Sequence, residues 1–215
     1  MLSMVRKDIK EFIKTISNNV TIVAASKYVD VDDVKVLLDA GICDIGENRV
    51  ESFLHKYELL QNQPIKWHFI GHLQKNKAKD IINKIDFLDS LDSLKLAELI
   101  EKERLSPLKC LVEVSINLEE NKNGVPYFEL ENFLKAVKAY SKVEVVGLMM
   151  MSIRYSDEQA LKQQFKKLRL LRDEMEQKLH IKLPYLSMGM SEDYQEAIEE
   201  GATHIRLGRI LFNLL

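Results

Sequence analysis

Apolar positions along the chain switch repeatedly between the spacing of strands and the spacing of helices. Short runs rich in valine and isoleucine indicate buried strands, and apolar positions three or four residues apart indicate one face of a helix. The strands predicted in this way cover 20–26, 42–46, 66–70, 85–91, 109–116, 143–149, 184–188 and 203–208. The predicted helices cover about 3–18, 30–41, 48–61, 74–85, 93–105, 126–140, 156–180 and 191–201.

Several helix starts are marked by residues with known positional preferences. Asp30 is placed to cap the second helix, because a side-chain oxygen at this position accepts from free backbone N–H groups. Pro126 suits a first helical turn, and Ser156 with Gln159 forms a capping-box pair. Ser191, which two acidic residues follow, is expected to start the last helix.

Strictly alternating strands and helices imply a parallel sheet. Eight such units in 215 residues predict an α/β fold with a single domain over 1–215, a (β/α)8 TIM barrel. The rival is an open, doubly wound sheet. Its common signal is a glycine-rich phosphate loop, GxGxxG or GxxxxGK[ST], and neither pattern occurs.

In such a barrel, ligands bind at the C-terminal ends of the strands. Polar residues stand at the predicted ends of most strands: Lys27, Glu47, Asn48, His72, Ser115, Asn117, Ser187, Arg206 and Arg209. Lys27 alone closes the apolar run VTIVAAS, as an amine nucleophile at a barrel mouth would. The alternative is that Lys27 is an ordinary solvated loop residue.

Odd- and even-numbered residues of the last strand are predicted to lie on opposite faces of the sheet. Successive residues of a strand face opposite sides, so His204, Arg206 and Gly208 share one face. Arg206 is therefore predicted to point into the barrel mouth, where a buried arginine needs a partner. A ligand is one such partner.

The loops after the last two strands suit a phosphate. They read SMGMS at 187–191 and Gly208-Arg209. Small residues let the backbone approach a ligand, and free N–H groups favour an anion. The alternative is that Gly189 and Gly208 only make tight turns. Glu192 and Asp193 count against a dianion there, although acids also stabilise helix starts.

Composition and charge exclude several classes of protein. The net charge of −2 disfavours binding to nucleic acid or to an anionic membrane surface. The two cysteines, Cys43 and Cys110, stand in apolar runs, which suits a reducing compartment. No apolar run approaches a membrane span, and no signal peptide is evident, so a cytoplasmic protein is expected. His68 and His72 are too far apart on a strand, roughly 13 Å, to share a metal ion, and no metal site is expected.

The motifs together resemble one family. They are AASKY around Lys27, IGENRVE at 45–51, WHFIGHLQKNK at 67–77, NLEENKNG at 117–124, GLM at 147–149 and LSMGMSEDYQEAIEEGATHIRLGRILF at 186–212. In this order they are similar to the pyridoxal phosphate homeostasis proteins, which are single-domain barrels like the N-terminal domain of alanine racemase. The resemblance covers almost the whole chain.

The resemblance implies a cofactor and residues that hold it. It implies that Lys27 forms an internal aldimine with pyridoxal 5'-phosphate and that Arg206 faces the pyridine nitrogen. It also implies that Ser187, Gly208 and the backbone of Arg209 hold the phosphate.

Three further residues follow from the same resemblance. Asn48 is similar to a family residue near the cofactor, and Lys122 resembles a second lysine that interacts with the cofactor or its entry. Asn213 departs from the family, which usually has glycine after the phenylalanine.

The expected function is to hold pyridoxal 5'-phosphate and to buffer or deliver it, without turnover, as a monomer. An arginine opposite the pyridine nitrogen makes the ring a weak electron sink. By family analogy, racemases add a second base from another domain, which this chain lacks. The expected partners are the cofactor and apo-enzymes that use it. Two alternatives stay open: a pyridoxal-phosphate-dependent amino-acid racemase of low activity, and a Schiff-base aldolase without cofactor.

Overall fold

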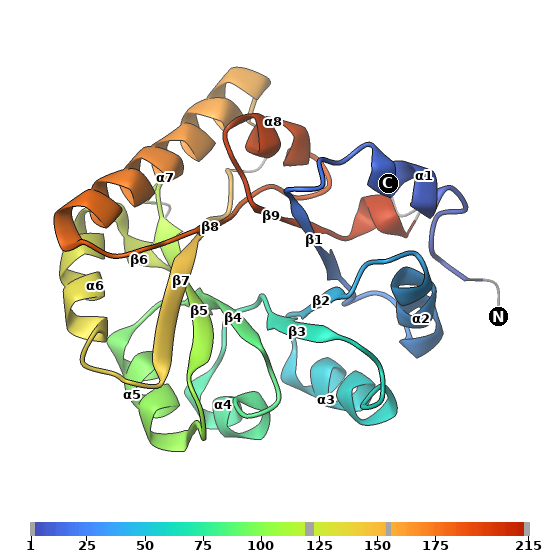
Figure 1. Cartoon of the computed structure of the whole chain (residues 1–215), viewed down its shortest axis with the longest axis horizontal. Helices are drawn as coiled ribbons and strands as arrows, with labels where there is room; N and C mark the ends of the chain where they lie inside the picture. The colour runs from blue at the N-terminus through green and yellow to red at the C-terminus, as the bar shows by residue number, and fades with distance from the viewer. Residues whose placement is uncertain (1–2, 119–122, 154–155, 213–215) are drawn as a thin grey trace.

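Eight parallel strands close into a barrel in the computed structural model, which describes residues 3–118, 123–153 and 156–212 (Figure 1). The strands are β1 (Thr21–Ala25), β2 (Asp44–Glu47), β3 (Lys66–Phe69), β4 (Phe87–Leu91), β5 (Leu108–Ser115), β7 (Val143–Met149), β8 (Tyr185–Ser187) and β9 (His204–Leu207). Their order is β4-β3-β2-β1-β9-β8-β7-β5, and a β4–β5 pairing closes the ring. The first strand thus pairs with the last, with Val23 opposite Arg206. The predicted barrel is confirmed.

The helices lie around the outside of the barrel (Figure 1). They are α1 (Ile9–Lys14), α2 (Val31–Asp39), α3 (Val50–Leu59), α4 (Lys75–Ile81), α5 (Leu94–Glu103), α6 (Leu130–Val137), α7 (Glu158–Leu179) and α8 (Tyr194–Glu199). The described residues also form two 3-10 turns, η1 (Tyr127–Glu129) and η2 (Arg209–Leu211).

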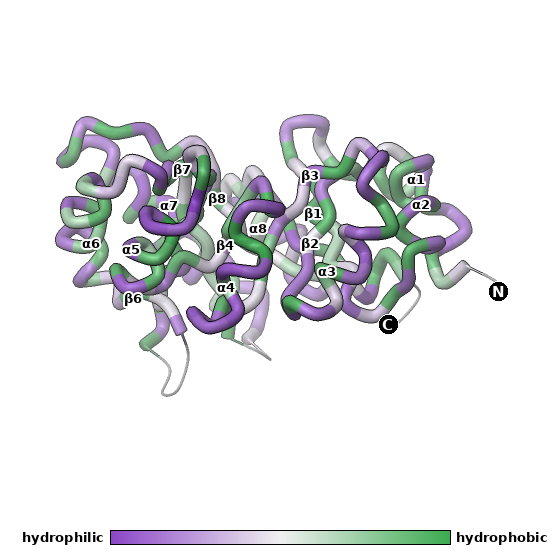
Figure 2. The backbone as a smooth tube through the Cα atoms, turned by 90° about the horizontal axis from the view of Figure 1, so that it is seen from below, coloured by the Kyte–Doolittle hydropathy of each residue, from purple (hydrophilic) through white to green (hydrophobic). Residues whose placement is uncertain are grey.

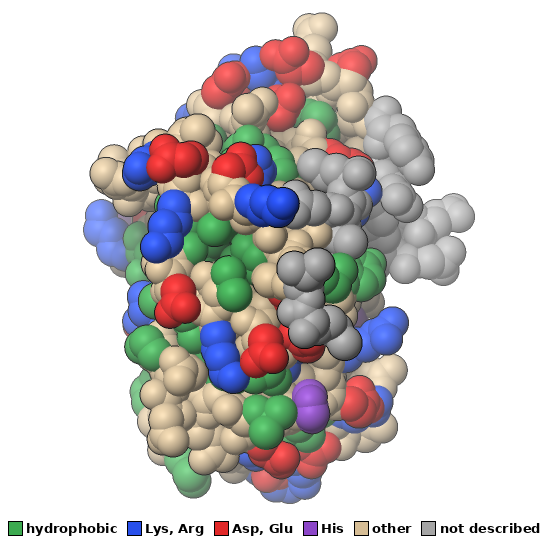
Figure 3. Space-filling view, turned by 90° about the vertical axis from the view of Figure 1, so that its right-hand side faces the viewer, with side chains coloured by type: hydrophobic (Ala, Val, Ile, Leu, Met, Phe, Trp, Pro, Cys, Tyr) green, Lys and Arg blue, Asp and Glu red, His purple; other side chains and the backbone are tan. Residues whose placement is uncertain are grey.

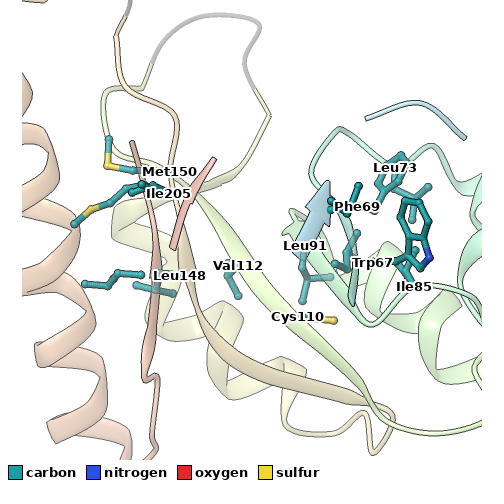
Figure 4. Close-up of a cluster of buried hydrophobic side chains, with 14 of the residues drawn as sticks. Trp67, Phe69, Leu73, Ile85, Leu91, Cys110, Val112, Leu148, Met150 and Ile205 are labelled. Carbon is teal, nitrogen blue, oxygen red and sulfur yellow. The ribbon is translucent and has the colours of Figure 1, made fainter. Parts of the chain in front are cut away.

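The main core fills the layer between the barrel and its helices. Apolar and polar segments alternate along the chain, as their amphipathic patterns require (Figure 2). Figure 4 shows two parts of this layer, Trp67, Leu73 and Ile85 on one side and Leu148, Met150 and Ile205 on the other. Ile205 and Leu207 are buried here, whereas Arg206 lines an inner cavity, so the parity predicted for this strand is confirmed.

The barrel interior holds a smaller apolar cluster and a set of buried charges. Phe87, Leu111, Val146 and Met149 form the cluster. The ring of His68 stacks on Phe87 with centroids 4.4 Å apart. The interior is therefore partly ionic, unlike the branched apolar filling common in such barrels.

His68 lies between two carboxylates. Its Nδ1 is 2.9 Å from Asp89 Oδ1 and its Nε2 is 3.1 Å from Asp44 Oδ1. Burial opposes the charged imidazole, but the charge of Asp89 and the hydrogen bonds to both carboxylates outweigh it and raise the pKa of His68 to about 9. Burial lowers the pKa of the neighbouring His204 to about 4.

The first helix is shorter than predicted. Residues before Ile9 are not helical, and α1 covers Ile9–Lys14 only. The side chain of Asp33 explains the difference, because its Oδ1 accepts from the Ser3 hydroxyl and from the Met4 backbone N–H, both at 2.7 Å. These bonds hold the leading segment against α2 instead of letting it join the helix.

Three predicted helix starts were wrong, and one was confirmed. Asp30 caps α2, accepting from the N–H groups of residues 32 and 33. Asp157, rather than Ser156, caps α7, because its carboxylate accepts from the Ala160 N–H at 2.8 Å. Pro126 is extended and belongs to a short strand, β6 (Val125–Pro126), which pairs with β5. Ser191 does not cap α8, and its hydroxyl instead bonds the loop after β9.

The surface is mixed in charge. Figure 3 shows acidic and basic side chains interspersed over one face of the molecule, as a net charge of −2 with 30% charged residues implies. Among the helices that the structure describes, none has the length and apolar character needed to cross a membrane.

Candidate functional site

A cavity of about 860 Å³ opens at the C-terminal ends of the strands. The residues that line it come from the ends of β1, β5 and β9 and from the loops after β7 and β8. Its volume is in the range of sites for small organic ligands. The charged side chains on its wall are Lys27, Glu113, Glu192, Asp193, Arg206 and Arg209.

Lys27 stands at the rim of the cavity, in the turn that follows β1. Its side chain is exposed, and Nζ lies 4.7 Å from the centroid of the Tyr28 ring. Within residues 3–118, 123–153 and 156–212, its amine makes no hydrogen bond or ion pair. The amine is therefore free to meet a ligand.

Arg206 forms part of the cavity floor. It is 4% exposed, and its guanidinium donates to Ser187 Oγ and to the Met150 carbonyl, both at 2.8 Å. No carboxylate of the described residues lies within ion-pair distance of it. Burial lowers the pKa of Arg206, and the more distant charge of Asp89 opposes this shift. The side chain is thus a fixed cation held by neutral acceptors.

Ser191 joins the loop after β8 to the loop after β9. Its hydroxyl oxygen accepts from the N–H groups of Gly208 and Ile210, each at 3.3 Å. Gly189 makes this arrangement possible, because its φ of +91° suits glycine and a Cβ there would lie 2.6 Å from the Ala197 side chain. Both loops therefore meet at one edge of the cavity.

The two acidic residues of this region already have partners. Asp193 is buried, and its carboxylate accepts from the Met190 N–H and from the Ser152 hydroxyl, both at 2.5 Å. Glu192 pairs with the guanidinium of Arg209 at 2.7 Å. The acids therefore organise the loops, and the charge of Glu192 is compensated by Arg209.

The predicted site residues are brought together in part. Lys27, Arg206, Gly208 and Arg209 line the same cavity, whereas Ser187 is fully buried and contacts Arg206. Asn48 is not among the described residues that line it.

Asn48 instead packs against the loop after β3. A Cβ on Gly71 would lie 2.6 Å from the Asn48 carbonyl oxygen, so only glycine permits this approach. Asn48 Oδ1 is buried, and the described residues provide no partner for it. Lys122 and Asn213 lie outside the described residues.

Sequence reasoning missed Glu113. It stands on β5, lines the cavity and makes no hydrogen bond through its side chain with the residues described. Burial, helped by the charge of Asp92, raises its pKa. The available signal was a charged residue in the apolar run LVEV, on the same strand face as Leu111 and Ser115.

Gln164 was also missed. This α7 side chain is 8% exposed, and its Oε1 accepts from Asn117 Nδ2 and from the Ile153 N–H, both at 2.9 Å. Its Nε2 donates to Ser156 Oγ at 3.1 Å. One glutamine thus ties the loop after β5 to the loop after β7. The signal was a polar residue at a core-facing position of the helix, beside Phe165.

The donors around the cavity suit a phosphate ester that carries a carbonyl group. An amine and a guanidinium face it, and the loops after β8 and β9 meet at its edge. A carboxyl without a hydrogen-bond partner among the described residues stands on the opposite wall. No group of three or more histidine, cysteine or acidic residues suited to a metal ion occurs in the part of the chain that the structure describes.

Comparisons with known proteins point to the same class of ligand. The family model described as "Alanine racemase, N-terminal domain" matches residues 2–215. Proteins named pyridoxal phosphate homeostasis protein are similar along most of the chain. The one from Aquifex aeolicus is 39% identical over 91% of this chain and 87% of its own length, and the one from Synechocystis is 36% identical over 94% of each.

Solved structures agree with this similarity. PipY of Synechococcus elongatus, solved with PLP bound, superposes with a TM-score of 0.87 at 28% identity, over 95% of this chain and 99% of its own. Alanine racemase from Corynebacterium glutamicum superposes with a TM-score of 0.79 at 14% identity, over 96% of this chain and 60% of its own. The second likeness shows the fold alone.

Proposed function

The chain belongs to the family of pyridoxal phosphate homeostasis proteins, and from this premise we propose that it binds pyridoxal 5'-phosphate in the cavity above Arg206. In this proposal the protein holds the cofactor, buffers its free concentration and gives it up to enzymes that need it. The relatives are named for homeostasis, not for a reaction.

The residues of the cavity fit this cofactor. When bound, the cofactor supplies an aldehyde carbon that condenses with a primary amine and releases water. Lys27 offers that amine at the rim. In this proposal Arg206, on the cavity floor, donates to the pyridine nitrogen. Gly208 and Arg209 line the cavity at the edge where the loops after β8 and β9 meet, and the phosphate is expected there, with the Arg209 backbone as a donor.

Ser187 and Asn48 take different places in the proposal. Ser187 supports Arg206 by accepting its hydrogen bond, and its contact with phosphate stays a prediction. Asn48 does not line the cavity, and its buried Oδ1 has no partner among the described residues, so its contact with the cofactor stays a prediction.

One observation carries the proposal: a buried arginine faces the same cavity as an exposed lysine, and neither has a carboxylate partner among the described residues. Two such cations favour an anionic ligand. The phosphate and the ring oxygen of the cofactor supply the negative charge.

Borohydride trapping tests the proposal. Purified protein incubated with pyridoxal 5'-phosphate is expected to gain a visible absorption band, and reduction is expected to fix one cofactor mass on Lys27. Lys27→Ala should lose the adduct, and Lys35→Ala, which changes an exposed lysine of α2, should keep it. Protein that gains neither band nor mass would refute the proposal.

Delivery, compartment and oligomeric state belong to the same proposal. The exposed amine at the rim supports exchange of the cofactor with solvent or with an apo-enzyme. The thiols of Cys43 and Cys110 are free, which supports a reducing cytoplasm. The cofactor is expected to pass to an apo-enzyme faster than it dissociates into buffer. Light scattering is expected to find the protein monomeric.

A second candidate is an amino-acid racemase of low activity that uses the same cofactor. Glu113 favours it, because this carboxyl lines the cavity besides Lys27, has a raised pKa and makes no ion pair with the described residues. Deuterium exchange at the α-carbon of a panel of amino acids decides the matter. The racemase would be established if exchange is faster than with free cofactor and if Glu113→Gln abolishes this excess. Exchange at the rate of free cofactor would eliminate the racemase.

A further inference from the structure

A buried ionic cluster lies directly behind Lys27. Lys56 Nζ donates to the Ser26 carbonyl at 2.6 Å and pairs with Glu47 Oε1. The Ser26 hydroxyl donates to the same Glu47 oxygen at 2.6 Å. Relative exposures are 0% for Ser26 and Glu47 and 3% for Lys56. Three polar side chains thus meet one residue before the exposed lysine.

The fold brings this cluster together from three neighbouring elements. Ser26 follows β1, Glu47 ends β2, and Lys56 stands in α3, which returns from β2. The Ser26 N–H also donates to the Gly46 carbonyl at 3.0 Å, extending the β1–β2 ladder by one residue. The N–H, carbonyl and hydroxyl of Ser26 are therefore all fixed, and the chain becomes a turn only at Lys27.

Stability alone does not account for such a cluster. Taking a lysine and a glutamate out of water costs several kcal/mol per ion, and apolar replacements of buried pairs are often neutral or stabilising. Glu47 Oε2 is buried without a partner among the described residues, which adds to the cost. What the cluster specifically provides is a hydrogen bond from Lys56 to the main chain at the residue before Lys27.

We propose that Glu47 and Lys56 are positioning residues, which hold the 26–27 peptide so that the amine of Lys27 stays at the cavity rim. The inference rests on the proposed function, because the fixed position of the Lys27 amine serves attachment of the cofactor. The pair acts through the Ser26 carbonyl and hydroxyl and contacts no ligand itself. Preorganised geometry of this kind governs the rate of attachment more than the affinity of the phosphate end.

The test compares Lys56→Met, Glu47→Gln and the double variant. Amide hydrogen exchange at residues 26–28 in protein without cofactor is expected to accelerate in all three. Attachment of pyridoxal 5'-phosphate, followed by absorbance, is expected to slow roughly 10-fold or more. The dissociation constant of pyridoxine 5'-phosphate, which has no aldehyde, is expected to stay unchanged.

The double variant separates positioning from folding. It removes both charges, so its resistance to urea should recover towards the wild-type value. Attachment should stay slow, because the Ser26 carbonyl keeps only the Val29 N–H, 3.1 Å away, as a donor. Lys77→Met, which breaks an exposed ion pair between α4 and α3, is the matched control and should change neither quantity.

Two outcomes would overturn the inference. One is wild-type attachment rates in the well-folded double variant, and the other is unchanged exchange at residues 26–28. Failure of the wild-type protein to bind cofactor would instead refute the proposed function, and the exchange measurement would still decide whether the pair fixes the turn.

Discussion

Each end of the barrel interior holds a buried cation, and the two cations differ in the charge of their hydrogen-bond partners. In the amino-terminal half, His68 has carboxylate oxygens 2.9 and 3.1 Å from its ring nitrogens. At the other end, Arg206 bonds a serine hydroxyl and a backbone carbonyl. A cation whose charge is already matched contributes to structure. One satisfied only by neutral acceptors keeps its charge for a ligand. The distinction supports the proposed site at the carboxyl end of the strands.

Replacing His68 should give the largest effect. His68→Ala leaves the buried Asp89 and the half-buried Asp44 without their shared partner, so the free energy of unfolding is expected to fall by about 3–5 kcal/mol. Urea unfolding measures this loss. His72→Ala, which removes an exposed histidine bonded to Asp92, should cost less than about 1 kcal/mol. Equal losses in the two variants would contradict the comparison.

The pH dependence of stability is a second test of the structural role of the His68 charge. Because the folded pKa of His68 is raised from 6.5 to about 9, its contribution is complete below pH 6.5 and is lost as the pH rises through 9. The loss amounts to about 3 kcal/mol. His204, with a folded pKa of about 4, costs stability as the pH falls below 6.5.

A maximum of stability near neutrality is therefore expected. Urea midpoints measured from pH 4 to pH 9 are the check. His68→Gln should flatten the alkaline side only, and His204→Gln the acid side only. An alkaline fall that persists in His68→Gln would show that another group titrates there.

Replacing Arg206 should separate binding from folding. Arg206→Met keeps the length of the side chain and removes a cation that has no ion pair with the described residues. The free energy of unfolding should fall by about 1–3 kcal/mol, because the Ser187 hydroxyl and the Met150 carbonyl lose their donor, and this loss is smaller than that of His68→Ala. Loss of a charged hydrogen bond is expected to weaken cofactor binding by about 1.5–3 kcal/mol, roughly 10- to 100-fold in Kd. Fluorescence titration measures the Kd. A variant that unfolds readily but binds normally would reverse the roles assigned to the two ends.

The smallest effect is expected at Gln164. Gln164→Leu removes the bonds to Asn117, Ile153 and Ser156, which should lower stability by about 1–3 kcal/mol. Faster proteolysis in the loops after β5 and β7 is the accompanying change. Gln163→Leu, which changes the exposed residue just before Gln164, is the control and should leave the rate of loop proteolysis unchanged.

The barrel was predictable because it rests on patterns that local chemistry sets. Ile205 and Leu207 pack outward and Arg206 inward, as alternation along a strand requires. The Asp30 cap was predictable for the same reason, since its oxygen bonds N–H groups two and three residues away.

The predictions failed where distant residues compete for a local group. Ser3 and Met4 bond Asp33 rather than extending α1, and Ser191 bonds Gly208 and Ile210 rather than capping α8. Glu113 and Lys56 could not be assigned from the sequence, because a charged residue in an amphipathic pattern is usually solvated. Only the closed barrel shows which of them are buried.

The pairing of β1 with β9 determines when the site comes into being. Lys27 follows the first strand and Arg206 stands on the last, so the cavity has no floor until the final strand docks. At synthesis rates of roughly 5–20 residues per second, β1 leaves the ribosome about 10–40 s before β9. During that interval its edge is unpaired and exposed to association with other chains. A growing chain therefore has no assembled site for the cofactor, and closure of the barrel creates the site in one late step.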